Sequence, residues 1–174
     1  MIEELKCPYC GNQTVEENEL QQPEVTDKYA CGTCDKTFGL RANESIRQCH
    51  TFSFTYGGFH GGFKTILIEE QDGYADMKII PPYGVIENRE LTLRISLDEW
   101  RAIKAYLFQE LFVRSWDEDY YDSNIMDGTQ WELKLKFDNR KKFKVAGSNL
   151  FPALFDELLD YLDPYFEQVG ADKK

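Results

Sequence analysis

The sequence predicts an α+β chain, in which a small cysteine-bearing unit precedes an antiparallel sheet with two amphipathic helices. Two CxxC pairs lie within the first 34 residues. Short runs of β-branched and aromatic residues follow, separated by turn signals, and two longer segments carry apolar residues at helical spacing. We therefore predict two domains, one of residues 1–45 and one of residues 46–174.

The N-terminal unit is too poor in apolar residues to form a core of its own. The stretch between its cysteine pairs, TVEENELQQPEVTDKY (residues 14–29), is polar. Small units of this kind commonly depend on a metal for their stability. A polar connector, RANESIRQ (41–48), leads to the larger domain.

Strand-like segments predict an antiparallel meander followed by a hairpin. The meander strands are TFSFTY (51–56), FKTILIEE (63–70), YADMKII (74–80) and ELTLRIS (90–96). Turn signals separate them, the last being PPYG (81–84), and each connection is too short for a crossover helix. The hairpin joins residues 131–137 to residues 141–147. Lys134 and Lys136 alternate there with apolar residues, which predicts one solvated and one buried face.

The first helix is predicted over residues 97–116. Ser96 lies three residues before Glu99, the spacing of a capping box. The apolar stripe of this helix comprises Trp100, Ile103, Leu107 and Leu111. This spacing predicts that one face of the helix packs on the sheet.

The second helix is predicted over residues 150–163. Ser148 or Asn149 is expected to cap it, and Pro152 suits its first turn. Pro164 is expected to end or kink it. Its apolar stripe comprises Leu154, Phe155, Leu158, Leu159 and Leu162.

The first cysteine pair, CPYC, spells either the redox dithiol of glutaredoxins or half of a metal site. A redox motif should follow a buried strand and open a helix, yet only six residues precede Cys7, and the polar GNQT follows Cys10. A redox function would also leave Cys31 and Cys34 unexplained. The two pairs together favour a tetrathiolate metal site.

CPYCGN followed by YACGTCDKTF resembles a zinc ribbon. The resemblance implies one structural Zn²⁺ per chain, bound by Cys7, Cys10, Cys31 and Cys34. Four protein ligands would leave no open position for a substrate or for catalytic water. Iron in a rubredoxin-like site uses the same ligands and is the alternative.

The chain is acidic, with a formal net charge of −11 and a pI near 4.7. This charge disfavours broad binding to nucleic-acid phosphates and to anionic membranes. We find neither the apolar core of a signal peptide nor a membrane-length apolar run, so we expect a soluble, cytoplasmic protein with no membrane partner. Cysteines arranged as two CxxC pairs fit a reducing compartment.

Other candidate ligand residues have plainer interpretations. Cys49, His50 and His60 suit core or surface positions, because the four-cysteine set is already complete. The glycine-rich GGFHGGF around His60 is interpreted as a hairpin turn and not a phosphate cradle. The acidic, aromatic loop 117–128 fails the spacing of a calcium-binding EF-hand loop, and we interpret it as a solvated loop. The alternative for this loop is a contribution to partner binding through its tyrosines.

The C-terminal sequence IMDGTQWELKLKF, followed by KVAGSNLFPALFDELLDYL, resembles an uncharacterised bacterial α+β module with the pattern DG-x-x-W … G-x-N-x-x-P. The resemblance covers about the last 45 residues. It implies a bacterial origin and a shared architecture, and carries no activity. From the residues alone, Asp127 and Gly128 form a turn and Trp131 belongs to the core.

These observations favour a noncatalytic, zinc-binding protein that acts as a protein-binding or adaptor module. A nucleic-acid-associated zinc-ribbon protein is the first alternative, although the net charge argues against it. An enzyme acting on a small molecule through the α+β domain is the second. The sequence contains no Ser-His-Asp arrangement and no HExxH motif, and its two histidines offer little general-base capacity.

Overall fold

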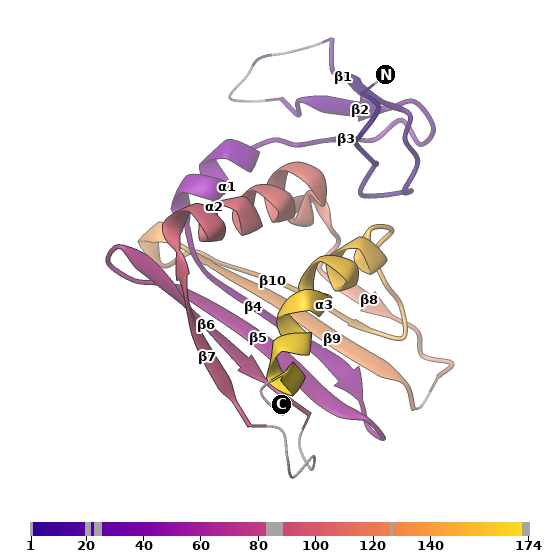
Figure 1. Ribbon diagram of the computed structural model, residues 1–174. Helices are drawn as coiled ribbons and strands as arrows, with labels where there is room; N and C mark the ends of the chain where they lie inside the picture. Colours follow the sequence, from indigo (N-terminus) through magenta and orange to yellow (C-terminus); the bar gives the residue numbers. More distant parts are fainter. Residues whose placement is uncertain (1, 20–21, 23–25, 83–88, 126, 172–174) are drawn as a thin grey trace.

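The computed structural model describes residues 2–19, 22, 26–82, 89–125 and 127–171. Two separate sheets form, one of three strands near the N-terminus and one of seven strands. Figure 1 shows the large sheet with its helices lying on one face and the three-stranded unit beyond them. The predicted α+β class, an antiparallel sheet with helices, is therefore confirmed.

The small sheet consists of β1 (Val15–Glu17), β2 (Tyr29–Cys31) and β3 (Thr37–Phe38), all antiparallel. Its buried cluster contains Cys7, Val15, Cys31 and Phe38, together with Phe112 from the larger part of the chain. The predicted polar connector after it is largely helical instead, because Ala42–Gln48 forms α1. The predicted boundary at residue 45 lies within this helix and stays a prediction.

The large sheet has the strand order β7-β6-β5-β4-β9-β10-β8. Its strands are β4 (Cys49–Gly58), β5 (Gly62–Glu70), β6 (Tyr74–Ile80), β7 (Leu91–Ser96), β8 (Asp119–Tyr121), β9 (Thr129–Phe137) and β10 (Lys142–Ser148). All neighbours are antiparallel except β8, which runs parallel to β10. The predicted meander and hairpin are both present, and the turn at 81–84 lies partly outside the described residues. Strand β8 falls in the segment that we predicted as a solvated loop.

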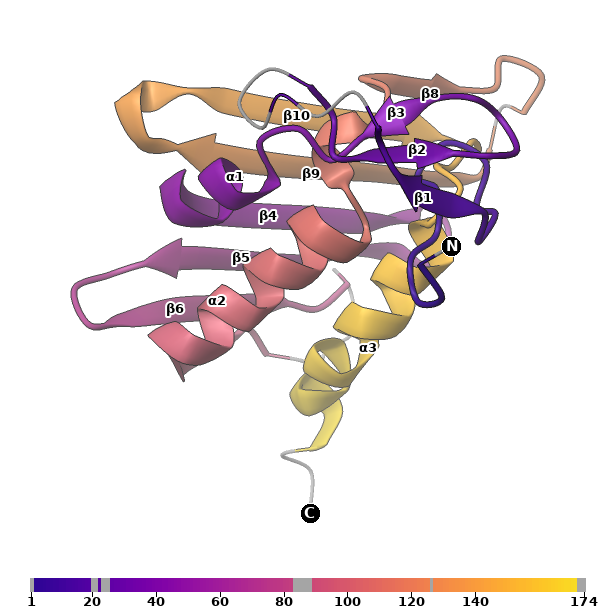
Figure 2. The same cartoon turned by 90° about the horizontal axis from the view of Figure 1, so that it is seen from above.

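The large sheet has one apolar face and one polar face. Apolar side chains such as Phe52, Phe54 and Leu135 are buried on the face that α2 and α3 cover. Figure 2 shows both helices lying across the strands on that face. Exposed lysines, among them Lys134 and Lys136, alternate with these positions and point to the opposite side.

The first predicted helix is interrupted. Helix α2 covers only Leu97–Ala105, and the chain continues as a π-helical turn, η1 (Tyr106–Glu110), and a short 3₁₀ turn, η2 (Val113–Ser115). The Ser96 side chain accepts a hydrogen bond from the Glu99 N–H at 3.1 Å, which confirms the predicted N-cap. The helix breaks because Phe112 adopts a left-handed conformation (φ 49°) and packs in the cluster of the small sheet.

The C-terminal helix is shifted from its predicted position. Helix α3 spans Phe155–Ala171 and runs through Pro164, so the helix does not end at this proline, and the predicted kink there stays a prediction. Tyr165, Phe166 and Val169 pack against the core after the proline, and their burial stabilises the continued helix. Pro152 lies before the helix and not in its first turn.

The predicted caps of α3 were also wrong. Asn149 has left-handed backbone angles (φ 60°), and its Oδ1 accepts a hydrogen bond from the Thr129 N–H at 2.8 Å. It therefore closes the gap between the end of β10 and the start of β9. Gly128 lies so close to the Asn149 side chain that a Cβ at position 128 would collide with it.

In the described chain, no helix is both long and apolar enough to cross a bilayer.

Candidate metal centre

Two tight turns carry the cysteines of the N-terminal unit. In the first, the Gly11 N–H donates to the Cys7 carbonyl at 2.8 Å, and Gly11 has a left-handed φ of 75°. In the second, the Asp35 N–H donates to the Cys31 carbonyl at 3.0 Å, and Asp35 has a φ of 59°. The left-handed residue of the second turn is Asp35 and not Gly32, the glycine between its two cysteines. Apart from glycine, aspartate and asparagine are the residues that adopt the left-handed conformation most readily.

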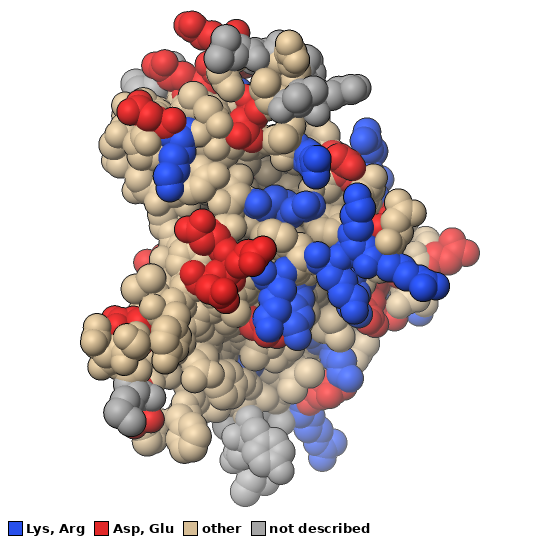
Figure 3. Space-filling view, turned by 180° about the vertical axis from the view of Figure 1, so that it is seen from behind, with Lys and Arg blue, Asp and Glu red and all other residues tan. Residues whose placement is uncertain are grey.

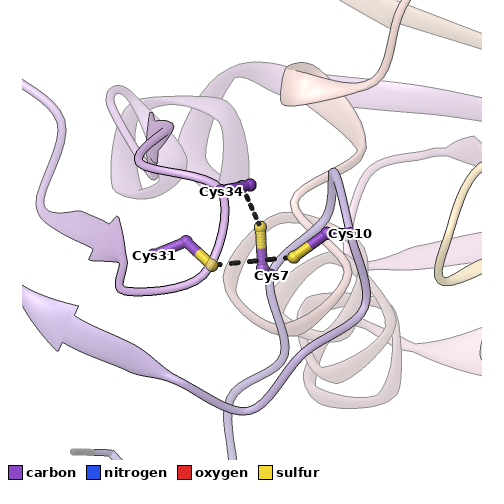
Figure 4. A group of neighbouring side chains, drawn as sticks. All are labelled: Cys7, Cys10, Cys31 and Cys34. Atoms are coloured by element: carbon purple, nitrogen blue, oxygen red, sulfur yellow. Dashed lines mark hydrogen bonds between the residues drawn. The ribbon is translucent and has the colours of Figure 1, made fainter.

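The two turns bring the four thiols together. Their sulfur atoms all lie within 4.8 Å of one another. Cys7 Sγ lies 3.7 Å from Cys34 Sγ, and Cys10 Sγ lies 3.6 Å from Cys31 Sγ (Figure 4). These separations exceed the 2.05 Å of a disulfide. Sulfurs about 2.3 Å from a tetrahedral metal ion would be about 3.8 Å apart, so the arrangement fits a tetrathiolate centre.

Hydrogen-bond donors point at three of the sulfurs. The Tyr9 N–H donates to Cys7 Sγ at 3.4 Å, and the Thr33 N–H donates to Cys31 Sγ at 3.4 Å. The Asn12 side-chain amide donates to Cys10 Sγ at 3.3 Å. Donors in these positions stabilise thiolates, which are the metal-binding form of cysteine.

The thiols differ in how easily they ionise. Burial raises the pKa of Cys31, but backbone N–H groups of Cys34 and Thr33 and the Thr14 hydroxyl outweigh it, and the pKa falls to about 6. Burial raises the pKa of Cys7 to about 12. Four thiolates this close together repel one another, so a bound cation is needed to hold all four in the ionised form.

The four-cysteine group packs against the part of the chain that forms the large sheet and its helices. The ring centroid of Phe112 lies 4.8 Å from that of Phe38 and 5.6 Å from that of Tyr29. Lys6 Nζ, next to the first cysteine turn, forms a 2.7 Å ion pair with Glu157 of α3. Gly11 lies against Ala153, just before α3. Phe112 was not recognised as part of this centre, because its neighbours in sequence fit a helical stripe.

The remaining cysteine and the histidines lie outside this group. Cys49 is buried, and its thiol donates to the Thr51 carbonyl at 3.5 Å. Both ring nitrogens of His50 have partners, the Thr51 hydroxyl at 3.0 Å and the Phe137 carbonyl at 3.1 Å. His60 is exposed at the tip of the β4–β5 hairpin.

The acidic loop assembles no ligand group in the described residues. Among all described residues of the chain, only the four cysteines form a set of three or more Cys, His, Asp or Glu side chains that lie close enough together to hold a metal ion. Two cavities in the described surface are large enough for a small molecule. One, of about 930 Å³, lies between the N-terminal unit and α1, and the other, of about 470 Å³, lies on the sheet near Trp131 and Tyr121. Neither is lined by His60 or Asp127.

Comparison of the chain with protein-family models, curated proteins and solved structures gives no significant match. What defines the protein is therefore its own geometry. It is an α+β protein with a four-cysteine centre suited to a metal ion.

Proposed function

We propose that Cys7, Cys10, Cys31 and Cys34 bind one Zn²⁺ and that this zinc is structural. The tetrahedral set of thiol ligands and their hydrogen-bond donors support zinc over harder metals, which prefer oxygen ligands. Four protein ligands leave no open coordination position, so the ion would stabilise the fold and take no part in catalysis. The residue set fits a zinc ribbon.

We further propose that the protein is a noncatalytic module that binds another protein. The observation that carries this proposal is a group of exposed apolar side chains, which we call the apolar end. Its members are Phe59, Phe63, Tyr121, Ile125, Leu150 and Phe151. Phe59 is 88% exposed and Tyr121 is 71% exposed, far more than aromatic side chains usually are in a protein without a partner.

Strand pairing places these residues at one end of the large sheet. Phe63 pairs with Gly57 at the end of β4, and Gly58 pairs with Thr129 at the start of β9. Tyr121 pairs with Ser148 at the end of β10. The Asn149 side-chain amide donates to the Ile125 carbonyl at 3.5 Å, and Leu150 and Phe151 follow directly. Aromatic residues grouped in this way are typical anchors of protein interfaces.

A basic strip on the N-terminal unit would have favoured nucleic acid as the partner of the ribbon. The lysines described there offer little support for that alternative. Lys6 is paired with Glu157 and Lys36 lies over the ring of Tyr9, so these two lysines form no free basic strip, whereas Lys28 lies over the ring of Tyr29 and lines the groove beside α1.

An affinity pull-down from the native cell tests the proposed function. The bait is the full chain, and the comparison variant is Phe59→Ser with Tyr121→Ser, which alters only exposed side chains. We expect a protein that the wild type captures at defined stoichiometry and that this variant loses. Cys31→Ser serves as a second bait, to show whether capture needs the metal centre. If wild type and the Phe59→Ser, Tyr121→Ser variant capture the same proteins, the apolar end is not the binding surface.

A further inference from the structure

A band of basic residues follows one side of the molecule, away from the apolar end. We define the basic band as the charged residues that line the larger cavity together with those of residues 132–144. Its bases are Lys28, Arg41, Arg47, Lys134, Lys136, Arg140, Lys141, Lys142 and Lys144, and its acids are Glu44, Glu110, Glu132 and Asp138. Figure 3 shows lysine and arginine side chains gathered on this side of the molecule.

The β9–β10 hairpin concentrates lysines on the sheet face that the helices leave open. Lys134 is directly opposite Lys144, and Lys136 is directly opposite Lys142. Alternate residues on a strand are about 6.7 Å apart, and paired residues are about 5 Å apart, so the four charges form a compact block. Like charges directly opposite one another destabilise a sheet. Repulsion within the block therefore destabilises the hairpin wherever no acidic side chain offsets it.

Only half of this block is neutralised within the described chain. Glu132 binds Lys134 at 2.7 Å and Lys144 at 2.9 Å. No acidic partner within ion-pair distance is found in the described residues for Lys136 or Lys142. The strand neighbours of Lys136 are Thr51 and Lys142, and both lysines are exposed.

The groove between the N-terminal unit and α1 extends the block. This cavity of about 930 Å³ is lined by Lys28, Arg41, Arg47 and Lys141, against only two acids. Lys141, which directly follows the hairpin turn, lines this groove, so the groove reaches the end of the sheet that carries the lysine block. Tyr29 and the side chains of Asn43 and Gln109 line the same groove and offer a ring and polar groups to a ligand.

The charge of the band contrasts with that of the chain. The band holds nine bases and four acids, which leaves eleven bases and 27 acids for the rest of the sequence. A local positive field in an otherwise negative molecule confines an anionic ligand to this one side.

We propose that the basic band binds the backbone of a single-stranded nucleic acid. Such a strand carries one phosphate on every residue, and these evenly spaced charges match the closely spaced bases of the block and the groove better than the irregular carboxylates of an acidic peptide do. A concave groove admits one flexible strand, whereas a rigid duplex presents its phosphates on a convex surface. This binding is separate from the proposed protein interaction and does not depend on it.

Fluorescence anisotropy with the full-length, metal-containing protein tests the proposal. The probes are a labelled single-stranded oligonucleotide of about 20 residues, its duplex and a labelled polyglutamate. We expect the single strand to bind most tightly at about 50 mM salt and to lose affinity steeply by about 200 mM. The Lys136→Glu, Lys142→Glu variant should weaken binding by about tenfold or more, and should lower the slope of log K against log salt by about 1.4.

The matched control is Lys78→Glu with Arg101→Glu, which changes the net charge equally on β6 and α2. It should bind the single strand as the wild type does. If the Lys136→Glu, Lys142→Glu variant does not keep the wild-type melting temperature, Arg140→Glu with Lys141→Glu replaces it as the test variant. The proposal is overturned if the single strand does not bind at 50 mM salt, or if duplex or polyglutamate binds more tightly. An equal loss in control and test variants would overturn it as well. Loss of binding in the Phe59→Ser, Tyr121→Ser variant would also contradict it.

Discussion

Asn149 joins two strand ends through one side chain. Its left-handed backbone follows β10, and its Oδ1 accepts the hydrogen bond of the Thr129 N–H, with which β9 begins. Asparagine tolerates left-handed angles better than most residues, and glycine at position 128 leaves space for its amide. The local sequence explains why we predicted a helix cap here, since asparagine before a helical stripe favours that role too. Only the strand pairing distinguishes a helix-capping asparagine from one that links two strand ends.

Asn149→Ala is expected to lower the free energy of unfolding by about 2–4 kcal/mol. The loss combines an unsatisfied backbone N–H with a left-handed conformation that alanine disfavours. Asn149→Asp keeps the acceptor and should stay within about 1 kcal/mol of the wild type. Urea denaturation of the three proteins measures this, and equal stability of Ala and Asp variants would show that the Thr129 hydrogen bond is unimportant.

At the scale of elements, the strands were the most predictable part of the fold. Alternating apolar and polar residues in β9 fix both the strand and its buried face, and short turns leave only antiparallel pairing. The four cysteines were equally predictable, because paired CxxC turns have few other uses. The course of the chain around Phe112 was not predictable. Its ring leaves the helical stripe to fill the small sheet's core, and that contact is tertiary.

Phe112 places a bulky residue in a strained conformation to bridge the two sheets. A π-helical turn directly precedes it, and such turns and strained residues persist only where surrounding packing holds them. Phe112→Ala should lower the free energy of unfolding by about 3–5 kcal/mol, since a buried ring is lost. Phe112→Gly loses the same ring but relieves the left-handed strain, so it should be about 1–2 kcal/mol more stable than the alanine variant. Chemical denaturation compares the free energies of unfolding of the two variants. A glycine variant less stable than the alanine variant would contradict backbone strain at position 112.

At the scale of the whole molecule, the two apolar clusters predict two responses to metal removal. The large cluster holds 25 buried residues, whereas the small one holds five, two of them cysteines. Chelation should therefore abolish amide protection in β1, β2 and β3 and around Phe112, while β4, β5 and β9 stay protected. Hydrogen exchange with mass spectrometry resolves these segments. Loss of protection across the large sheet, or no loss anywhere, would contradict an autonomous large core.

The molecule as a whole has binding features that the net charge conceals. A total of −11 predicts poor binding to nucleic acid, yet the hairpin lysines of the basic band lie toward the end of the large sheet opposite the apolar end. The sequence does contain a signal for the band, because residues 134–144 hold six bases and one acid. What it lacks is the register that sets four of those lysines face to face and the α1 groove that continues them.

The central claim is that four thiolates hold one zinc ion in the N-terminal unit. Elemental analysis of protein purified without chelators, combined with native mass spectrometry, tests it most directly. We predict one zinc per chain in the wild type and little or none in Cys31→Ser. Metal-free wild-type protein with a Cys7–Cys10 disulfide, or iron in place of zinc, would contradict the claim.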